Sequence, residues 1–292
     1  MVKKICTVVF CLIAILAIAK ISIAQPIVLQ QAENTLAADK VELGLGFIYG
    51  YEKYTIEGTT GDFTRSGASI PILFKWAVSN SLETKVVLPY TTWKNTGTGI
   101  PDTSNSGIGQ MVVGGKLNFI DDKESGLSIG LGVDLELPTG DASKGLGEGS
   151  HILIRGGILP SSGTNVAVAG ILTQKFDPLA FHVNLGYKYT AKYTVSDVNM
   201  DTGDIIIYGL AGEYAIGDGI AVIGELVGTS FGKAKVADTE ENESNGTTFD
   251  TVIGVSYTSE SMRIILGCPI ALGNATYGPY AFKIVSGFSL IF

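Results

Sequence analysis

Apolar and polar residues alternate along most of the chain after residue 25, in segments of about ten residues, the length of a membrane-crossing strand. In the clearest segment, 127–137, every odd position is leucine, isoleucine or valine, and every even position is serine, glycine, aspartate or glutamate. Segments 70–78 and 179–190 follow the same pattern. Because strand side chains point alternately to two faces, each segment has one apolar and one polar face. The pattern predicts an all-β protein.

Twelve strands of this kind are expected. We place them at 41–53, 67–78, 82–93, 107–120, 126–138, 164–175, 179–192, 204–215, 220–231, 248–257, 262–271 and 280–292. An even number lets both termini lie on the same side of a membrane. Residues 151–159 could form a thirteenth strand. We assign 138–163 instead to an elaborated external loop that carries a short hairpin or folds inward.

Three features favour a transmembrane antiparallel β-barrel over a soluble β-sandwich, whose strands also alternate. The strands are long enough to cross a bilayer at a tilt. Aromatic residues such as Tyr90, Trp93 and Tyr187 lie near strand ends, as in an interfacial girdle. Short connections such as 79–81 alternate with long ones such as 95–106, as expected for periplasmic turns and external loops. No apolar stretch of helical membrane-spanning length follows Gln25.

The first 24 residues have the pattern of a cleavable signal peptide. Lys3 and Lys4 precede the apolar run 5–19, and Ser22-Ile23-Ala24 supplies small residues before a cleavage site. A permanent anchor is the alternative, but spanning a bilayer takes roughly 20 apolar residues. We therefore expect a signal peptide at 1–24, a periplasmic N-terminal segment at 25–40 and an outer-membrane β-barrel at 41–292.

Composition and charge narrow the expected partners. The whole chain has a net charge of −8, and loss of the three lysines in 1–24, which holds no acidic residue, leaves −11. Such an acidic balance disfavours nucleic acid as a partner. Only Cys268 remains after cleavage, so no internal disulfide can form. The expected surroundings are the lipid bilayer of the bacterial outer membrane.

The C-terminus adds a second indication of outer-membrane biogenesis. Phe288, Leu290 and Phe292 fall on one face of the last strand, and an aromatic residue ends the chain. Resemblance to outer-membrane proteins implies that this terminal phenylalanine belongs to the signal used by the barrel-insertion machinery.

The polar faces of the strands predict the lining of the barrel lumen. Its charged members and one histidine are Glu42, Glu52, Lys75, Glu83, Lys85, Lys116, Asp134, Glu136, His182, Lys188, Glu213, Glu225, Arg263 and Lys283. A strongly ion-selective pore would carry an excess of one sign. The near balance of signs indicates a narrow lumen crossed by salt bridges. Two interpretations stay open: these residues hold the barrel together, or they line a polar path for a substrate.

Candidate catalytic and metal sites are weak. The only histidines are His151 and His182, and a lipase-type site would need its histidine on the lipid-facing wall. Segment 238–244 has oxygen ligands at short spacing but lacks the pattern of a calcium-binding EF-hand loop. Segment 140–149 is rich in glycine, yet no Gly-Lys-Ser/Thr follows, so it is not a phosphate loop. We expect no catalytic residue, no metal and no cofactor, and the chain is not expected to be an enzyme.

Five motifs stand out, at 106–109, 115–119, 137–147, 182–187 and 208–214. Together they resemble the phenol meta-pathway degradation family of outer-membrane proteins, whose members are often described as transporters. The resemblance covers roughly residues 35–292. The chain departs from the family pattern at Gln110, where aspartate is usual, and in its extra length at 151–163. The resemblance implies uptake of aromatic or other hydrophobic small molecules and carries no binding residues over.

The leading hypothesis is therefore a porin-like passive channel of the outer membrane, for aromatic or other hydrophobic small molecules. The alternative is a structural or adhesion-type surface barrel that transports nothing, because charge pairs and segment 138–163 plug its lumen.

Overall fold

The computed structural model describes residues 29–32, 35–55, 62–97, 100–141, 163–195, 197–240, 245–272 and 280–292. Their regular structure is entirely β. Within these ranges no helix is long and apolar enough to cross a membrane. The expected signal peptide at 1–24 and the ambiguous segment 151–159 lie outside the described residues.

The main sheet is an antiparallel barrel of twelve wall positions, as predicted. Its neighbour order is β2-β1-β17-β16-β15-β12-β11-β8-β7-β6-β5-β3, and pairing of β2 with β3 closes it. The strands are β1 (Val41–Thr55), β2 (Asp62–Ala77), β3 (Leu82–Gly97), β4 (Ile100–Ile108), β5 (Met111–Asp122), β6 (Leu127–Leu137), β7 (Asn165–Phe176), β8 (Leu179–Tyr189), β11 (Ile205–Gly217), β12 (Ile220–Phe231), β15 (Gly246–Thr258), β16 (Met262–Leu272) and β17 (Tyr280–Ile291). Strands β4 and β5 pair with successive stretches of β3 and share one wall position.

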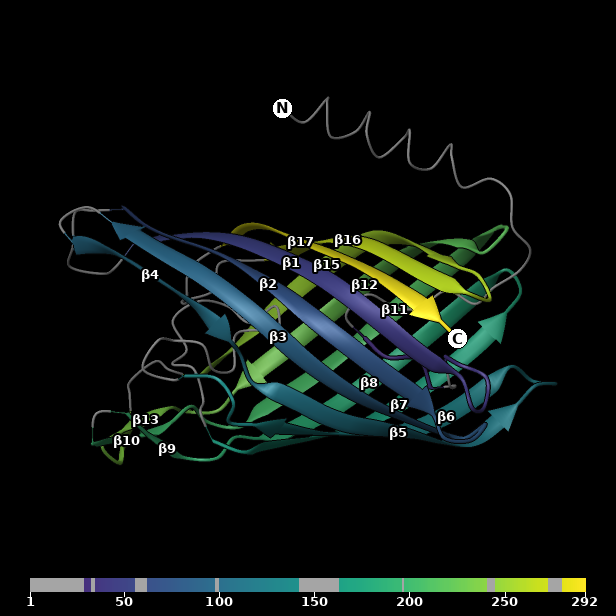
Figure 1. Ribbon diagram of the computed structural model, residues 1–292, viewed down its shortest axis with the longest axis horizontal. Coiled ribbons are helices and arrows are strands. Elements are labelled where there is room, and N and C mark those ends of the chain that lie inside the picture. The colour runs from purple at the N-terminus through teal and green to yellow at the C-terminus, as the bar shows by residue number, and fades with distance from the viewer. Residues whose placement is uncertain are drawn as a thin grey trace, which may run out of the picture.

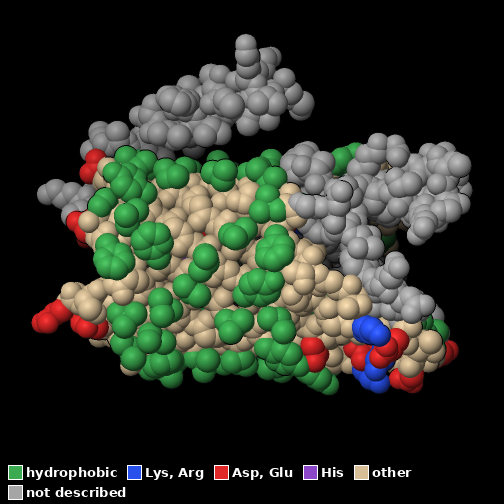
Figure 2. Space-filling model, turned by 180° about the vertical axis from the view of Figure 1, so that it is seen from behind, with side chains coloured by type: hydrophobic (Ala, Val, Ile, Leu, Met, Phe, Trp, Pro, Cys, Tyr) green, Lys and Arg blue, Asp and Glu red, His purple; other side chains and the backbone are tan. Residues whose placement is uncertain are grey.

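Closure satisfies the backbone in lipid, and the alternation then sorts the side chains between lipid and lumen. Outward positions carry exposed apolar side chains, for example Leu45, Ile72 and Leu185. Figure 2 shows apolar side chains over much of one outer wall, with the visible acidic and basic side chains near its two ends. This outer surface is the apolar band that a membrane barrel presents to hydrocarbon.

The two ends of the barrel differ, as the lengths of the connections predict. Tight turns gather at the end where the C-terminus lies, which we call the short-turn end (Figure 1). One is Asp218-Gly219, where both residues have positive φ (50° and 80°) and join β11 to β12 in two residues. Such hairpin turns match the twist of the strands they connect, and glycine adopts positive φ without strain.

The opposite end, the long-loop end, contains more strand than the sequence predicts (Figure 1). Segment 95–106 was expected to be a loop. That prediction is wrong, because β3 continues to Gly97 and β4 pairs with it from Ile100 to Ile108. The physical reason is that a strand projecting into water needs no apolar face. Its residues, such as Asp102 and Ser104, therefore lack the alternation that identifies a strand in lipid.

A small second sheet also lies at the long-loop end (Figure 1), in or next to the segments expected to be loops at 195–203 and 233–247. It consists of β9 (Tyr193–Val195), β10 (Val198–Asp201), β13 (Lys235–Val236) and β14 (Thr239–Glu240). Exposed ion pairs accompany it: Lys233 Nζ lies 2.8 Å from Glu240 Oε2, and Lys192 Nζ lies 3.1 Å from Asp238 Oδ1. Surface pairs of this kind contribute little stability.

Candidate functional site

Residues 29–32 and 35–36, which precede β1, lie inside the barrel. The backbone N–H of Leu29 donates to Glu225 Oε2 (3.1 Å), and the backbone of Gln30 exchanges two hydrogen bonds of 2.8 Å with the Asn184 amide. The N–H of Ala32 donates to Thr173 Oγ1 (2.9 Å). The sequence analysis placed 25–40 in the periplasm. Residues 29–32 of that segment contact lumen side chains of β7, β8 and β12.

Glycines on the inner wall make room for this segment. A Cβ on Gly130 would lie 3.1 Å from the backbone oxygen of Ala32, and one on Gly209 would lie 3.1 Å from Leu29 Cδ1. The Leu29 side chain in turn packs against Ala211, Val227 and Val252 in a small buried cluster. The inner wall is therefore shaped to hold a chain segment, which we call the lumen segment (29–32 and 35–36).

Five charged side chains surround the lumen segment near the short-turn end, and we call them the basal charge cluster. They are Glu42, Lys75, Glu83, Lys116 and Arg263. Arg263 Nη1 contacts both Glu42 carboxylate oxygens at 3.1 and 2.9 Å. Lys75 Nζ lies 3.2 Å from Glu42 and 3.7 Å from Glu83, and Lys116 Nζ also lies 3.7 Å from Glu83. Since a buried charge is costly unless it is paired, the alternating signs make the cluster stable.

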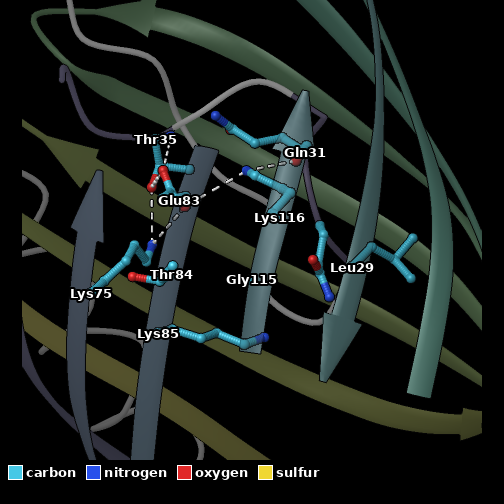
Figure 3. Close-up of a pocket in the computed structure, with 10 residues that line it drawn as sticks. Leu29, Gln31, Thr35, Lys75, Glu83, Thr84, Lys85, Gly115 and Lys116 are labelled. Atoms are coloured by element: carbon cyan, nitrogen blue, oxygen red, sulfur yellow. Dashed lines mark hydrogen bonds and ion pairs between the residues drawn. The ribbon is translucent and has the colours of Figure 1, made fainter. Parts of the chain in front are cut away.

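The same cluster anchors the lumen segment (Figure 3). Glu83 accepts hydrogen bonds from the Thr35 backbone N–H (2.5 Å) and hydroxyl (3.0 Å). Lys75 donates to Thr35 Oγ1 at 2.9 Å, and Arg263 donates to its carbonyl at 3.1 Å. Lys116 donates to the Gln31 carbonyl at 3.0 Å. A polar cavity of about 180 Å³ remains between the segment and the wall.

His182 and its neighbours form a buried polar chain. The Nδ1 atom of His182 lies 2.9 Å from Thr173 Oγ1, and its Nε2 lies 3.3 Å from Glu213 Oε1. This order of hydroxyl, imidazole and carboxylate is that of a catalytic triad. The His182 side chain is 0 % exposed, however, so no substrate reaches the imidazole in this arrangement. The contacts join β7, β8 and β11 across the inner wall.

A cavity of about 310 Å³ lies next to the lumen segment and is bordered by Leu29 and Gln30. Much of its wall is aliphatic. Seven inward-facing side chains from seven strands form what we call the aliphatic belt: Ile48, Val87, Val112, Ile207, Val227, Val252 and Val285. A second cavity of about 300 Å³ adjoins it at Ile48, Val87 and Val285.

Two ion pairs lie on the wall opposite part of this belt. Lys85 Nζ lies 2.9 Å from Asp134 Oδ1, and Lys188 Nζ lies 2.8 Å from Glu136 Oε2. Asn165 Nδ2 also donates to Glu136 at 2.9 Å. These side chains come from β3, β6, β7 and β8 and border the 310 Å³ cavity or lie next to it.

The structure places most of the charged residues expected in the lumen on the inner wall. Ten are less than a tenth exposed: Glu42, Glu83, Lys116, Glu136, His182, Lys188, Glu213, Glu225, Arg263 and Lys283. Lys75, Lys85 and Asp134 are partly buried, and the side chain of Glu52 lies outside the described residues. The structure gathers five of them in the basal charge cluster and pairs others separately: Lys85 with Asp134, Lys188 with Glu136 and His182 with Glu213.

The sequence analysis missed the lumen segment and the aliphatic belt. The belt has a detectable signal, because two or three apolar residues follow one another where alternation would place a polar one. Examples are 47–49, 86–88 and 205–207. In the described residues no group of three or more His, Cys, Asp or Glu could hold a metal ion.

Comparisons with known proteins agree with this architecture. The family model described as "Putative MetA-pathway of phenol degradation" matches residues 53–267. An outer-membrane channel from Pseudomonas putida F1 has a similar structure, with a TM-score of 0.71 and 14 % identity over 89 % of this chain and 98 % of that one. The translocator domain of the autotransporter NalP from Neisseria meningitidis gives a TM-score of 0.54 and 9 % identity over 88 % of each chain. No curated protein matches the sequence. The structural likenesses establish the fold of outer-membrane barrels.

Proposed function

This chain belongs to the phenol-degradation family whose model matches it, and on that premise we propose that it is a passive channel for small aromatic or other hydrophobic compounds. The barrel is of the bacterial outer-membrane class.

The aliphatic belt is the observation that carries this proposal. A porin for hydrophilic solutes has a polar, water-filled interior. Here the middle of the lumen presents valine and isoleucine from seven strands around a cavity of about 310 Å³. Apolar constrictions resist filling by water and ions, whereas an apolar solute gains by leaving water there.

Transport by the purified protein tests the proposal. We expect proteoliposomes to release or take up toluene and phenol faster than protein-free liposomes, with little swelling in glucose. Single-channel conductance should be small, because the basal charge cluster and the lumen segment narrow the path for ions. Absence of flux for every aromatic compound tried would contradict the proposal.

A second candidate is a surface barrel that transports nothing, and the lumen segment is the specific observation that favours it. Its backbone is held from several sides by Glu225, Asn184, Thr173 and Glu83. Removing residues 25–36 separates the two candidates. A channel should pass aromatic solutes with the segment in place, whereas a plugged, non-transporting barrel should pass them only after the segment is removed.

Export and assembly complete the proposal. Residues 1–24 would direct export, and the last strand would be recognised by the barrel-insertion machinery. In support, Phe292 is exposed, and its backbone exchanges hydrogen bonds with Val41 at 2.9 and 3.2 Å where β17 meets β1. Because His182 is sealed from solvent and the similar solved structures are a channel and a translocator domain, we expect no catalytic activity.

A further inference from the structure

A glycine on the cavity wall, Gly114, leaves the space in which the Lys85 and Asp134 side chains meet. Lys85 on β3 is paired in register with Gly114 on β5, and Gly114 is paired with Asp134 on β6. A Cβ on Gly114 would collide with the Asp134 carboxylate and would lie 2.9 Å from Lys85 Cε. The two charged side chains therefore meet directly over the glycine, which holds them at one height on the wall.

This pair faces the cavity more openly than its neighbour. The side chains of Lys85 and Asp134 are 27 % and 23 % exposed, against 2 % and 4 % for Lys188 and Glu136. An ammonium has three donors, and a carboxylate has about four acceptor positions. Lys85 Nζ lies 2.9 Å from both carboxylate oxygens of Asp134, which uses only part of that capacity. A ligand in the cavity can therefore accept from Lys85 and donate to Asp134 at the same time.

The size of the cavity limits the body of such a ligand. An apolar cavity of about 150 Å³ is enough to bind benzene. The cavity here measures about 310 Å³, and the aliphatic belt supplies its apolar surface. One aromatic ring with a substituent fits in this volume.

The charges at the cavity determine which polar group of a ligand can bind there. The Lys85–Asp134 pair is neutral as a whole, and the other charged groups at the cavity, Lys188 with Glu136 and the buried Asp250, have interactions of their own. A carboxylate would bring a second negative charge beside Asp134, where low polarity strengthens repulsion. A hydrocarbon would form no hydrogen bond with Lys85 or Asp134. A hydroxyl group is both donor and acceptor and matches the pair.

We propose that the Lys85–Asp134 pair and the aliphatic belt form a binding site for a neutral, single-ring aromatic compound that carries a hydroxyl group. The site deepens the proposed function, on which it rests, by naming the class of solute. The ring lies against the belt, while the hydroxyl donates to Asp134 and accepts from Lys85. Gly114 acts as a positioning residue for the pair.

Binding in nanodiscs tests the site without requiring transport. Fluorine NMR would measure saturable binding of 4-fluorophenol, 4-fluorotoluene and 4-fluorobenzoate to the full mature chain, with empty nanodiscs as background. We expect 4-fluorophenol to bind about tenfold more tightly than 4-fluorotoluene, the usual size of a hydrogen bond to charged groups. 4-Fluorobenzoate should bind most weakly.

Substitutions locate the effect. The variant Lys85→Gln/Asp134→Asn should lose the preference for 4-fluorophenol and keep the affinity for 4-fluorotoluene. The matched control is Lys94→Gln/Asp102→Asn, which removes an exposed pair of the same residue types (3.0 Å) outside the cavity and should change nothing. Gly114→Ala retains both charges but forces them apart, so it should also lose the preference. Migration of the unheated barrel in SDS gels verifies folding of each variant.

Equal affinities for the phenol and the toluene would overturn the site. So would a preference for 4-fluorophenol that survives both the double variant and Gly114→Ala in folded protein, or tightest binding of 4-fluorobenzoate. Flux of aromatic compounds without any effect of these substitutions would overturn the site and leave the channel standing. Selective binding in a barrel that passes no solute would refute the channel and support the site.

Discussion

The lumen has two levels with different side chains: the basal charge cluster near the short-turn end and the aliphatic belt in the middle. Near the short-turn end, the basal charge cluster binds the lumen segment through contacts of 2.5 to 3.3 Å. In the middle, the aliphatic belt borders a cavity of about 310 Å³, and its Val227 and Val252 pack against Leu29 of the lumen segment. Charged side chains reach across a lumen and bind backbone, whereas short branched aliphatic side chains cannot. The comparison indicates that closure resides at the basal level and selectivity at the belt.

Removing the lumen segment should have the largest effect on this contrast. A mature chain without residues 25–36 lacks the backbone groups that Glu83, Lys116 and Arg263 now bind. We expect its single-channel conductance in planar bilayers to rise severalfold, because water can enter the short-turn end. The Lys94→Gln/Asp102→Asn variant should conduct as the wild type does. Unchanged conductance after the deletion would show that the segment does not close the path.

Breaking the basal charge cluster should have the largest effect on stability. Glu83→Ala leaves Lys75 and Lys116 without a shared carboxylate in a buried setting. Removing one partner of a buried pair costs about 3–5 kcal/mol, and we expect a loss of that order in the free energy of unfolding, measured by urea titration in lipid vesicles. Glu124→Ala, in an exposed turn, is the control and should cost little. A small loss at Glu83 would mean that water solvates the cluster.

Making the belt polar should have a moderate effect on transport. Val87→Thr keeps the shape of the side chain and adds a hydroxyl at a position that lines both central cavities. Aromatic flux should fall by about fivefold, which corresponds to roughly 1 kcal/mol of lost apolar contact. The matched control is Val222→Thr on the lipid-facing side of β12, which should leave flux unchanged. Equal effects of both variants would place selectivity elsewhere than the belt.

The smallest effect is expected at the long-loop end, where charges are exposed instead of buried. The Lys233 ammonium lowers the pKa of Glu240 from its ordinary value of 4.5 through a hydrogen bond and charge attraction. A carboxyl with a lowered folded pKa contributes stability above its unfolded pKa, and that contribution disappears as pH falls through the folded value. Hydrogen exchange at β13–β14 should therefore quicken slightly below pH 4.5, while barrel strands stay protected. Lys233→Gln should remove this pH dependence.

Much of the fold could be predicted from the sequence, because alternation is imposed locally by lipid on one side. The strand positions and the inward direction of residues such as Glu83 and Asp134 follow from that period. The alternation does not predict which charged side chains pair with one another. Lys85, Gly114 and Asp134, for example, come together only because of the register of three strands. The lumen segment could not be predicted for another reason. Its backbone groups make most of its hydrogen bonds, and backbone hydrogen bonds leave no recognisable pattern in the amino-acid sequence.

The position of the lumen segment directly before β1 also constrains the order of assembly. Its hydrogen bonds reach Glu83 on β3, Asn184 on β8 and Glu225 on β12, strands from widely separated parts of the wall. These partners surround the segment only once β17 has joined β1 and the cylinder is complete. We therefore expect the lumen to be sealed late in biogenesis, after the barrel has closed.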